Sequence, residues 1–152
     1  MNANLRTALP RLVPKAIAWA EQTADDISRT GMALDDYGLS IARRVGVIHP
    51  ELIRIALVEL LPLPFDPELQ QAANMTGLLG PHIAGVTLGH SICVCRPHNS
   101  IRLLSHECRH VHQYEKAGSI AAFLPAYLLQ IVDFGYPNAP FELDARRHEI
   151  NE

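Results

Sequence analysis

The chain has 152 residues, of which 48% are hydrophobic and 19% are charged, and its formal net charge is −3. This length and composition predict one globular domain, residues 1–152. No basic patch stands out, so nucleic acid is not an expected partner. No apolar run of about 18 residues occurs, and residues 6–15 lack the continuous apolar core of a signal peptide, so neither a transmembrane helix nor a leader is expected.

Three cysteines, Cys93, Cys95 and Cys108, are present. An odd number of cysteines without a secretory leader favours reduced thiols in a cytoplasmic protein. Cys93 and Cys95 would point to the same face of a strand and could not bond each other without distortion. A structural zinc site made of Cys93, Cys95 and His98 is an alternative. Such sites usually need a second closely spaced ligand pair, and no second pair of cysteines exists.

The spacing of apolar residues and the helix-start signals predict four helices in the first half of the chain. They are residues 15–29, 33–44, 51–61 and 67–76. Three prolines between the last two predict an extended connection there. We therefore expect residues 1–80 to form a helical half.

Residues 86–95 alternate between apolar and small or polar side chains, which predicts a single strand. Its partner is harder to find, and residues 78–83 and 45–48 are the candidates. A strand in this place would pack beside the helix that follows it.

The next stretch contains His-Glu-x-x-His. On a helix, His106 and His110 lie one turn apart on one face, so their imidazole nitrogens can reach one metal ion. Glu107 can reach a water bound to that metal. Two neutral nitrogen ligands, an open metal position and a carboxylate that takes a proton are the parts of a zinc hydrolase. The alternative is an ordinary helix with two surface histidines.

Independent signals favour a helix at this motif. Asn99 or Ser100 can cap its start and Gly118 can end it. Apolar residues recur at i, i+4 and i+7 from Leu104. The two histidines flank this stripe, so we expect them to be partly buried.

The rest of the chain predicts two further helices. Residues 119–132 are almost continuously apolar and predict a buried helix, kinked or interrupted near Pro125, that packs behind the motif helix. Residues 133–140 have the composition of a loop. Residues 141–150 predict a last helix with Glu142 in its first turn. The expected fold is mainly α (α+β), with a small β element beside the metal-binding helix.

Two histidines leave a zinc ion with too few protein ligands, because catalytic sites usually have three. Glu142 follows His110 by 32 positions, which leaves room for one helix and a return. Small Ala145, one turn further on, allows close packing of the two helices. Asp144 is the alternative third ligand. It lies about 200° round the helix from Glu142, so both cannot bind one ion. His112 faces away from the histidine pair.

These motifs resemble those of the gluzincin group of zinc metallopeptidases, and more closely the small bacterial minimal gluzincins. The resemblance covers about residues 80–148. It rests on His106-Glu107-x-x-His110, on Glu142-x-x-Ala145, on the preceding strand, on His-x-x-Gln-Tyr at 110–114, on the apolar helix, and on the Gly-Tyr and Pro-Phe-Glu segments within 135–142.

The resemblance implies a zincin-like core in residues 81–152, with a motif helix, a C-terminal ligand helix and a small β element beside the site. It implies that His106, His110 and Glu142 hold Zn2+, and that Glu107 is the general base and later the proton donor. By the same resemblance, the free edge of the strand would pair with a peptide or protein substrate.

The predicted function is that of a small zinc metallopeptidase, with Tyr136 or Tyr127 as candidates to stabilise an oxyanion. One alternative is a zinc-binding regulatory or interaction domain of zincin fold that does not turn over peptides. A second is a structural metal protein that uses the cysteines. A closed shell of four protein ligands would favour either alternative, whereas a metal-bound water near Glu107 would favour the enzyme.

Overall fold

The computed structural model describes residues 3–80 and 82–151. It contains six α-helices, four strands and two 3-10 turns in those residues. The helices are α1 (Ala3–Thr30), α2 (Asp36–Arg44), α3 (Pro67–Thr76), α4 (Ile101–Ala117), α5 (Ile120–Phe134) and α6 (Pro140–Arg147). The strands are β1 (Met32–Ala33), β2 (Arg54–Val58), β3 (Gly85–Leu88) and β4 (Ser91–Cys95), and the turns are η1 (Pro50–Leu52) and η2 (Tyr136–Asn138).

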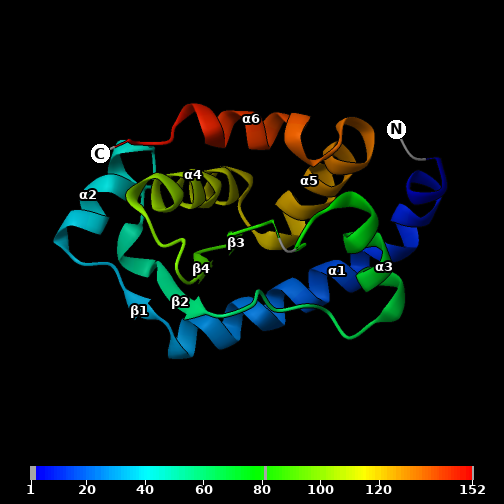
Figure 1. Ribbon diagram of the computed structural model, residues 1–152, viewed down its shortest axis with the longest axis horizontal. Helices are drawn as coiled ribbons and strands as arrows, with labels where there is room; N and C mark the ends of the chain where they lie inside the picture. The colour runs from blue at the N-terminus through cyan, green and yellow to red at the C-terminus, as the bar shows by residue number, and fades with distance from the viewer. Residues whose placement is uncertain (1–2, 81, 152) are drawn as a thin grey trace.

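The sheet separates two helical layers (Figure 1). The long helix α1 crosses one face of the sheet, and α4 lies on the other face with α6 stacked beyond it (Figure 1). Helix α5 packs against both α1 and α4. The predicted α+β class, mainly helical with a small β element, is confirmed.

The strand order is β1-β2-β4-β3. Strands β2 and β4 are parallel, whereas β1 and β3 pair antiparallel to them at the two edges. Parallel neighbours need a long crossover, and here the crossover contains α3. Strand β3 is therefore an edge strand, and it packs against α4.

The prediction of a helix at 51–61 is wrong, because β2 occupies the middle of that range. Its sequence, Ile-Ala-Leu-Val after Arg54, is a short apolar run whose periodicity does not separate a strand from a buried helix. A central strand covered on both faces needs apolar side chains at successive positions rather than alternation. The first half of the chain is accordingly not purely helical.

The prediction of one strand at 86–95 is also wrong. The segment is a hairpin that turns at Gly89 and His90, so β3 and β4 are each other's partner. Gly89 has φ of 67°, a left-handed conformation that favours glycine at a tight turn. Neither of the proposed partner segments is a strand. Residues 45–48 form a turn, and so do residues 78–80 and 82–83, which are the described part of the second segment.

Helix α1 begins earlier than predicted and continues through Pro10 and Pro14. Both prolines lie on the exposed side of the helix, so water can bond the carbonyl groups that lose their amide partners. Leu5 and Leu12 are buried on the opposite side and hold this first part of α1 against the protein.

The predicted start and end of the motif helix are confirmed. The Ser100 side chain accepts a hydrogen bond from the amide of Leu103, and Gly118 adopts φ of 105° after the last turn. Helix α3 has the bounds predicted for it, with Asp66 as its N-cap. Helix α5 is one helix that contains Pro125 rather than two pieces.

All three cysteines are free and buried. Cys93 and Cys95 pack together on the α1 side of the sheet, and Cys108 packs on the α4 side. Within the described residues, the thiols do not gather with His98 into a metal-binding group.

Among the residues that the structure describes, no single helix has the length and apolar character to cross a membrane. Helices α4 and α5 together do, but they are bent by 118° where they meet.

Glu115 joins three segments that are distant in sequence. Its two carboxylate oxygens accept hydrogen bonds from the backbone amides of Ile48 and His49 at 2.7 and 2.9 Å. One of these oxygens also lies within hydrogen-bond distance of Nε2 of His90, at 2.9 Å. Glu115→Ala leaves these donors without their charged acceptor, so we expect urea unfolding to show a loss of about 1–3 kcal/mol.

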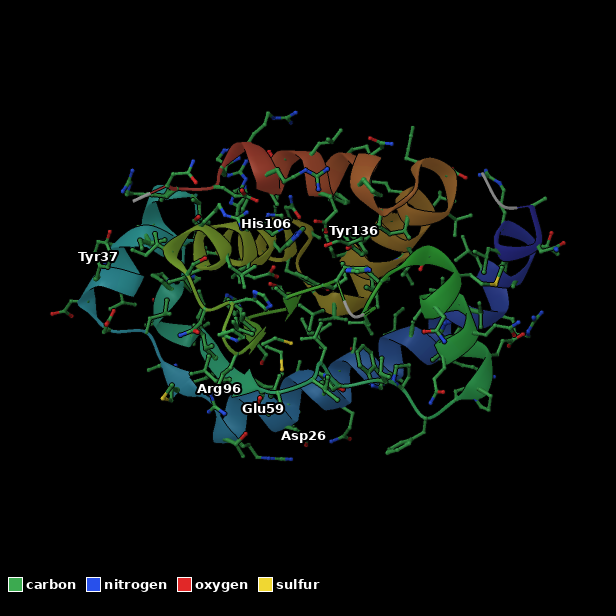
Figure 2. The ribbon with its side chains drawn as sticks, viewed as in Figure 1. Asp26, Tyr37, Glu59, Arg96, His106 and Tyr136 are labelled. Carbon is green, nitrogen blue, oxygen red and sulfur yellow. The ribbon has the colours of Figure 1, made fainter. Side chains whose placement is uncertain are left out.

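Glu59→Ala is the matched control for this prediction. Glu59 bonds Arg96 at 3.2 Å on the surface, and Figure 2 shows the two side chains together. An exposed pair contributes about 0–1 kcal/mol. Equal losses for the two variants would contradict the role assigned to Glu115.

Candidate metal centre

Helix α4 carries three of the four residues predicted to bind the metal or to act as the general base. His106, Glu107 and His110 are all buried on it, and Glu142 comes from the first turn of α6 with only 1% of its surface exposed. Figure 2 shows His106 on the side of α4 that faces α6. The antiparallel stacking of α6 on α4 therefore brings Glu142 to the histidine pair, although 32 positions separate it from His110.

The nitrogen and oxygen atoms of this group converge. Nε2 of His106 lies 3.1 Å from Oε1 of Glu142, and Nε2 of His110 lies 3.0 Å from Oε2 of the same carboxylate. One donor atom from each residue lies within 4.8 Å of the other two, so the group has the dimensions of a metal site. The structure thus brings together the three ligands that the sequence predicted.

The other ring nitrogen of His110 is held by Gln113. Its Nδ1 lies 2.8 Å from Oε1 of the amide. The orientation of that amide is set because its Nε2 donates to the carbonyl of Phe141 at 3.0 Å and to Asp144 at 2.9 Å. The amide oxygen can only accept, so Nδ1 of His110 carries the hydrogen.

The other ring nitrogen of His106 is held by Glu149. Its Nδ1 lies 2.8 Å from the carboxylate, which again requires the hydrogen on Nδ1. Glu149 follows the end of α6. The tail is held on α4 by the amide of Ile150, which donates to Ser105 at 2.8 Å.

When both rings are neutral, their Nε2 atoms present lone pairs to a carboxylate that also has only lone pairs. Such an arrangement is unfavourable unless positive charge lies between the atoms. Two protons would make two imidazolium rings of His106 and His110 with centroids 5.0 Å apart, and like charges this close and buried repel strongly. One metal cation among the three ligand atoms satisfies all of them at once.

The pKa shifts have the same origin. Burial lowers the pKa of His110, but the hydrogen bond and the charge of Glu142 outweigh it and raise the pKa to about 9. Burial would raise the pKa of Glu142, yet its bonds to the two histidines hold it far below the usual range. The carboxylate thus stays ionised and attracts a cation to the Nε2 atoms.

Glu107 lies next to this group but does not join it. Its Oε1 accepts the hydroxyl of Thr87 at 2.8 Å, and the same hydroxyl bonds the Glu107 backbone carbonyl at 3.1 Å. A Cβ at Gly85 would lie 3.2 Å from the other carboxylate oxygen, so glycine gives the carboxylate its space. Burial raises the pKa of Glu107, which makes it a stronger base near neutral pH.

The two tyrosines proposed for an oxyanion have different positions. The hydroxyl of Tyr127 donates to Oε2 of Glu142 at 2.8 Å, so it is already bonded to a member of the candidate metal group. Tyr136 is half-buried and lines the same cavity as His110 and Glu107. Burial and the charge of Glu142 raise the pKa of Tyr136, so it stays a proton donor.

Asp144 is not at the histidine pair. It pairs with Nε of Arg109 at 2.8 Å and accepts from Gln113. Asp144, the alternative third ligand, is therefore not part of the group that His106, His110 and Glu142 form. His112 faces away as predicted, and its Nδ1 lies 3.0 Å from the carbonyl of Gly46.

An apolar cavity of about 140 Å³ adjoins the site. Glu107, His110, Glu142 and Tyr136 supply polar groups to its wall, and the rest of the wall comes mainly from α1, α3, β3 and α5. The carboxylate of Glu107 is thus reachable from a space large enough to admit part of a substrate.

A comparison with known proteins finds no protein-family model, no curated protein and no solved structure that matches this chain.

Glu149 and Gln113 were not identified as site residues from the sequence. If Glu149 fixes the ring of His106, Glu149→Ala is expected to weaken zinc binding by about 10–100-fold, the usual effect of losing an orienting partner. Competition with a chromophoric chelator measures the affinity. Glu21→Ala, on the exposed surface of α1, is the control, and an affinity equal to that control would rule out the orienting role.

Proposed function

We propose that the protein is a zinc-dependent hydrolase of the metallopeptidase type, with a zincin-like arrangement of its site. The observation that supports this most is the pair of histidines whose Nδ1 atoms are already bonded and whose Nε2 atoms both face one ionised carboxylate. His106, His110 and Glu142 would hold the metal.

The residues fit zinc in number and chemistry. Zinc bonds nitrogen and carboxylate oxygen at about 2.0–2.2 Å in tetrahedral sites, which puts ligand atoms about 3.4 Å apart. The two Nε2–oxygen separations of 3.1 and 3.0 Å, each to a different oxygen of Glu142, are a few tenths of an ångström shorter than this. Two imidazoles and one carboxylate suit zinc better than calcium or magnesium, which prefer oxygen ligands.

The chemistry follows from where the neighbouring groups lie. A bound zinc ion lowers the pKa of a coordinated water and acts as a Lewis acid. Glu107, held by Thr87 and facing the cavity, accepts the proton of the attacking water and later gives it to the leaving group. Tyr136 can donate a hydrogen bond to the oxyanion that forms at the substrate carbonyl.

The backbone of β3 supports an extended substrate beside this site. Cys95 donates to the carbonyl of Ala84 at 2.8 Å, and in an antiparallel pair the residues that bond the partner alternate with those that do not. The amide and carbonyl groups of Gly85 and Thr87 therefore point to the free edge. A substrate main chain can bond this edge next to Glu107.

Zinc titration of the purified protein tests the proposal. We expect about one zinc per chain, and cleavage of at least one member of a peptide and acyl-amide library by the loaded protein. A protein that takes up no zinc would contradict the whole proposal. A protein that takes up zinc and cleaves no member would instead be the regulatory or interaction domain.

A further inference from the structure

We infer that the substrate carries a long unbranched acyl chain and that the cavity beside the metal centre holds this chain. The inference rests on the proposed hydrolase function and adds its substrate class. The cleaved bond is the amide that joins the acyl carbonyl to an amine. Water adds its hydroxyl to the acyl carbon, the C–N bond breaks, and the nitrogen takes the remaining proton, so a fatty acid and an amine result.

The wall of the cavity is long. It includes α1 from Leu5 to Ala20, which are about 22 Å apart along a helix at 1.5 Å per residue. Ala20 packs against Leu88, next to the Thr87 that holds Glu107, so this part lies beside the site.

The chemistry of the wall excludes a peptide main chain. Away from the site residues the wall is almost entirely apolar, with Leu9, Leu12 and Ala16 on one side and Leu69 and Ala72 on another. A threaded peptide would bury amide and carbonyl groups without partners, which is costly for each group. A hydrocarbon chain has no such groups and gains from every buried methylene.

The length of the cavity argues against an amino-acid side chain as its occupant. No natural apolar side chain reaches from β3 to Leu5, so most of the cavity would stay empty. An acyl chain whose carbonyl lies near Glu107 can extend along α1 and fill it.

Helix α3 is the wall that is least anchored. None of its residues is buried, and surface ion pairs from Arg11 to Glu68 and from Lys15 to Asp66 join it to α1. The loop before it exposes Leu63 and Phe65, the latter by 95%. A chain can therefore enter beneath α3 past apolar side chains.

Trp19 gives a direct assay, because it is the single tryptophan and lines the cavity. We expect butanoate, octanoate, dodecanoate and hexadecanoate, each below its micelle-forming concentration, to change Trp19 fluorescence with rising affinity. The gain should approach about fourfold per methylene, which is ~0.8 kcal/mol per buried CH2 converted to a ratio. An affinity that does not depend on chain length would overturn the inference.

Ala16→Phe is the variant that tests the location. Ala16 lines the cavity, whereas Ala18 lies on the exposed side of the same helix, so Ala18→Phe is the matched control. We expect Ala16→Phe to lose most of the chain-length dependence and Ala18→Phe to keep it. Ala72→Phe fills the same cavity from α3 and replaces Ala16→Phe if that variant does not fold. Equal behaviour of the cavity variants and the control would overturn the inference.

These measurements separate the inference from the proposed function, because fluorescence titration needs no bound metal. If the protein takes up zinc and cleaves peptides, but its affinity for fatty acids does not depend on chain length, the acyl-substrate inference is wrong and the hydrolase proposal stands. If the affinity for fatty acids rises with chain length but the protein takes up no zinc, the acyl-binding cavity is supported and the hydrolase proposal is wrong.

Discussion

Glu107→Gln is expected to keep its zinc and to lose hydrolysis by about 10²–10⁴-fold, the usual contribution of a general base. The amide has nearly the shape of the carboxylate but cannot accept a proton from water. The amide oxygen of the glutamine can still accept a hydrogen bond from the hydroxyl of Thr87, which lies 2.8 Å from Oε1 of Glu107 in the parent protein. The loss should therefore appear in kcat, with zinc affinity close to that of the parent.

Two measurements give this prediction its controls. Chelator competition shows whether the Glu107→Gln protein holds zinc as the parent does, and thermal unfolding shows whether it is folded. Glu51→Gln changes an exposed carboxylate on η1 and should leave the rate unchanged. A Glu107→Gln protein that cleaves the substrate at the parent rate would show that another group takes the proton.

Glu142→Ala is expected to lower zinc affinity by more than about 100-fold, beyond the range typical of losing a residue that only orients a ligand. Among the described residues, Glu142 is the one carboxylate bonded to both histidine Nε2 atoms, and alanine leaves those nitrogens without the proposed third ligand. The same change also removes the acceptor of the Tyr127 hydroxyl, so folding must be measured alongside.

Asp144→Ala is the matched control because it removes a carboxylate two positions away on the same helix. Asp144 bonds Arg109 and Gln113 and reaches His110 only through Gln113. Its loss should weaken zinc binding by less than about 100-fold. If Asp144→Ala released the metal while Glu142→Ala retained it, the assignment of the third ligand would be wrong.

The sequence was enough to place the two proposed histidine ligands on α4 because the relevant signals there are local. The i and i+4 spacing of His106 and His110 fixes their relative position once a helix forms, and Ser100 and Gly118 mark its ends. Glu142 was also placed correctly, since a short loop and a first-turn position leave few ways to stack α6 on α4.

Other features depend on contacts that no local pattern records. Strand β2 was mistaken for a helix because a run of apolar residues fits either element until its neighbours are known. Glu149 bonds His106 only because the chain after α6 folds back on α4, and nothing near Glu149 in sequence marks it. The role of Gln113 depends on the carbonyl of Phe141, which fixes its amide.

The division of the cavity wall between the two halves of the chain has a consequence for redesign. All the residues proposed to hold the metal or to take part in the reaction lie after about position 84, whereas α1 and α3 contribute lining residues that are apolar except for Thr76. For the proposed acyl site, substitutions in α1 and α3 are therefore expected to change which acyl chains bind without altering a residue assigned to the reaction. Variant libraries restricted to lining positions such as Leu9, Ala16 and Ala72 would change the selectivity for the bound chain while the residues assigned to the reaction stay unchanged.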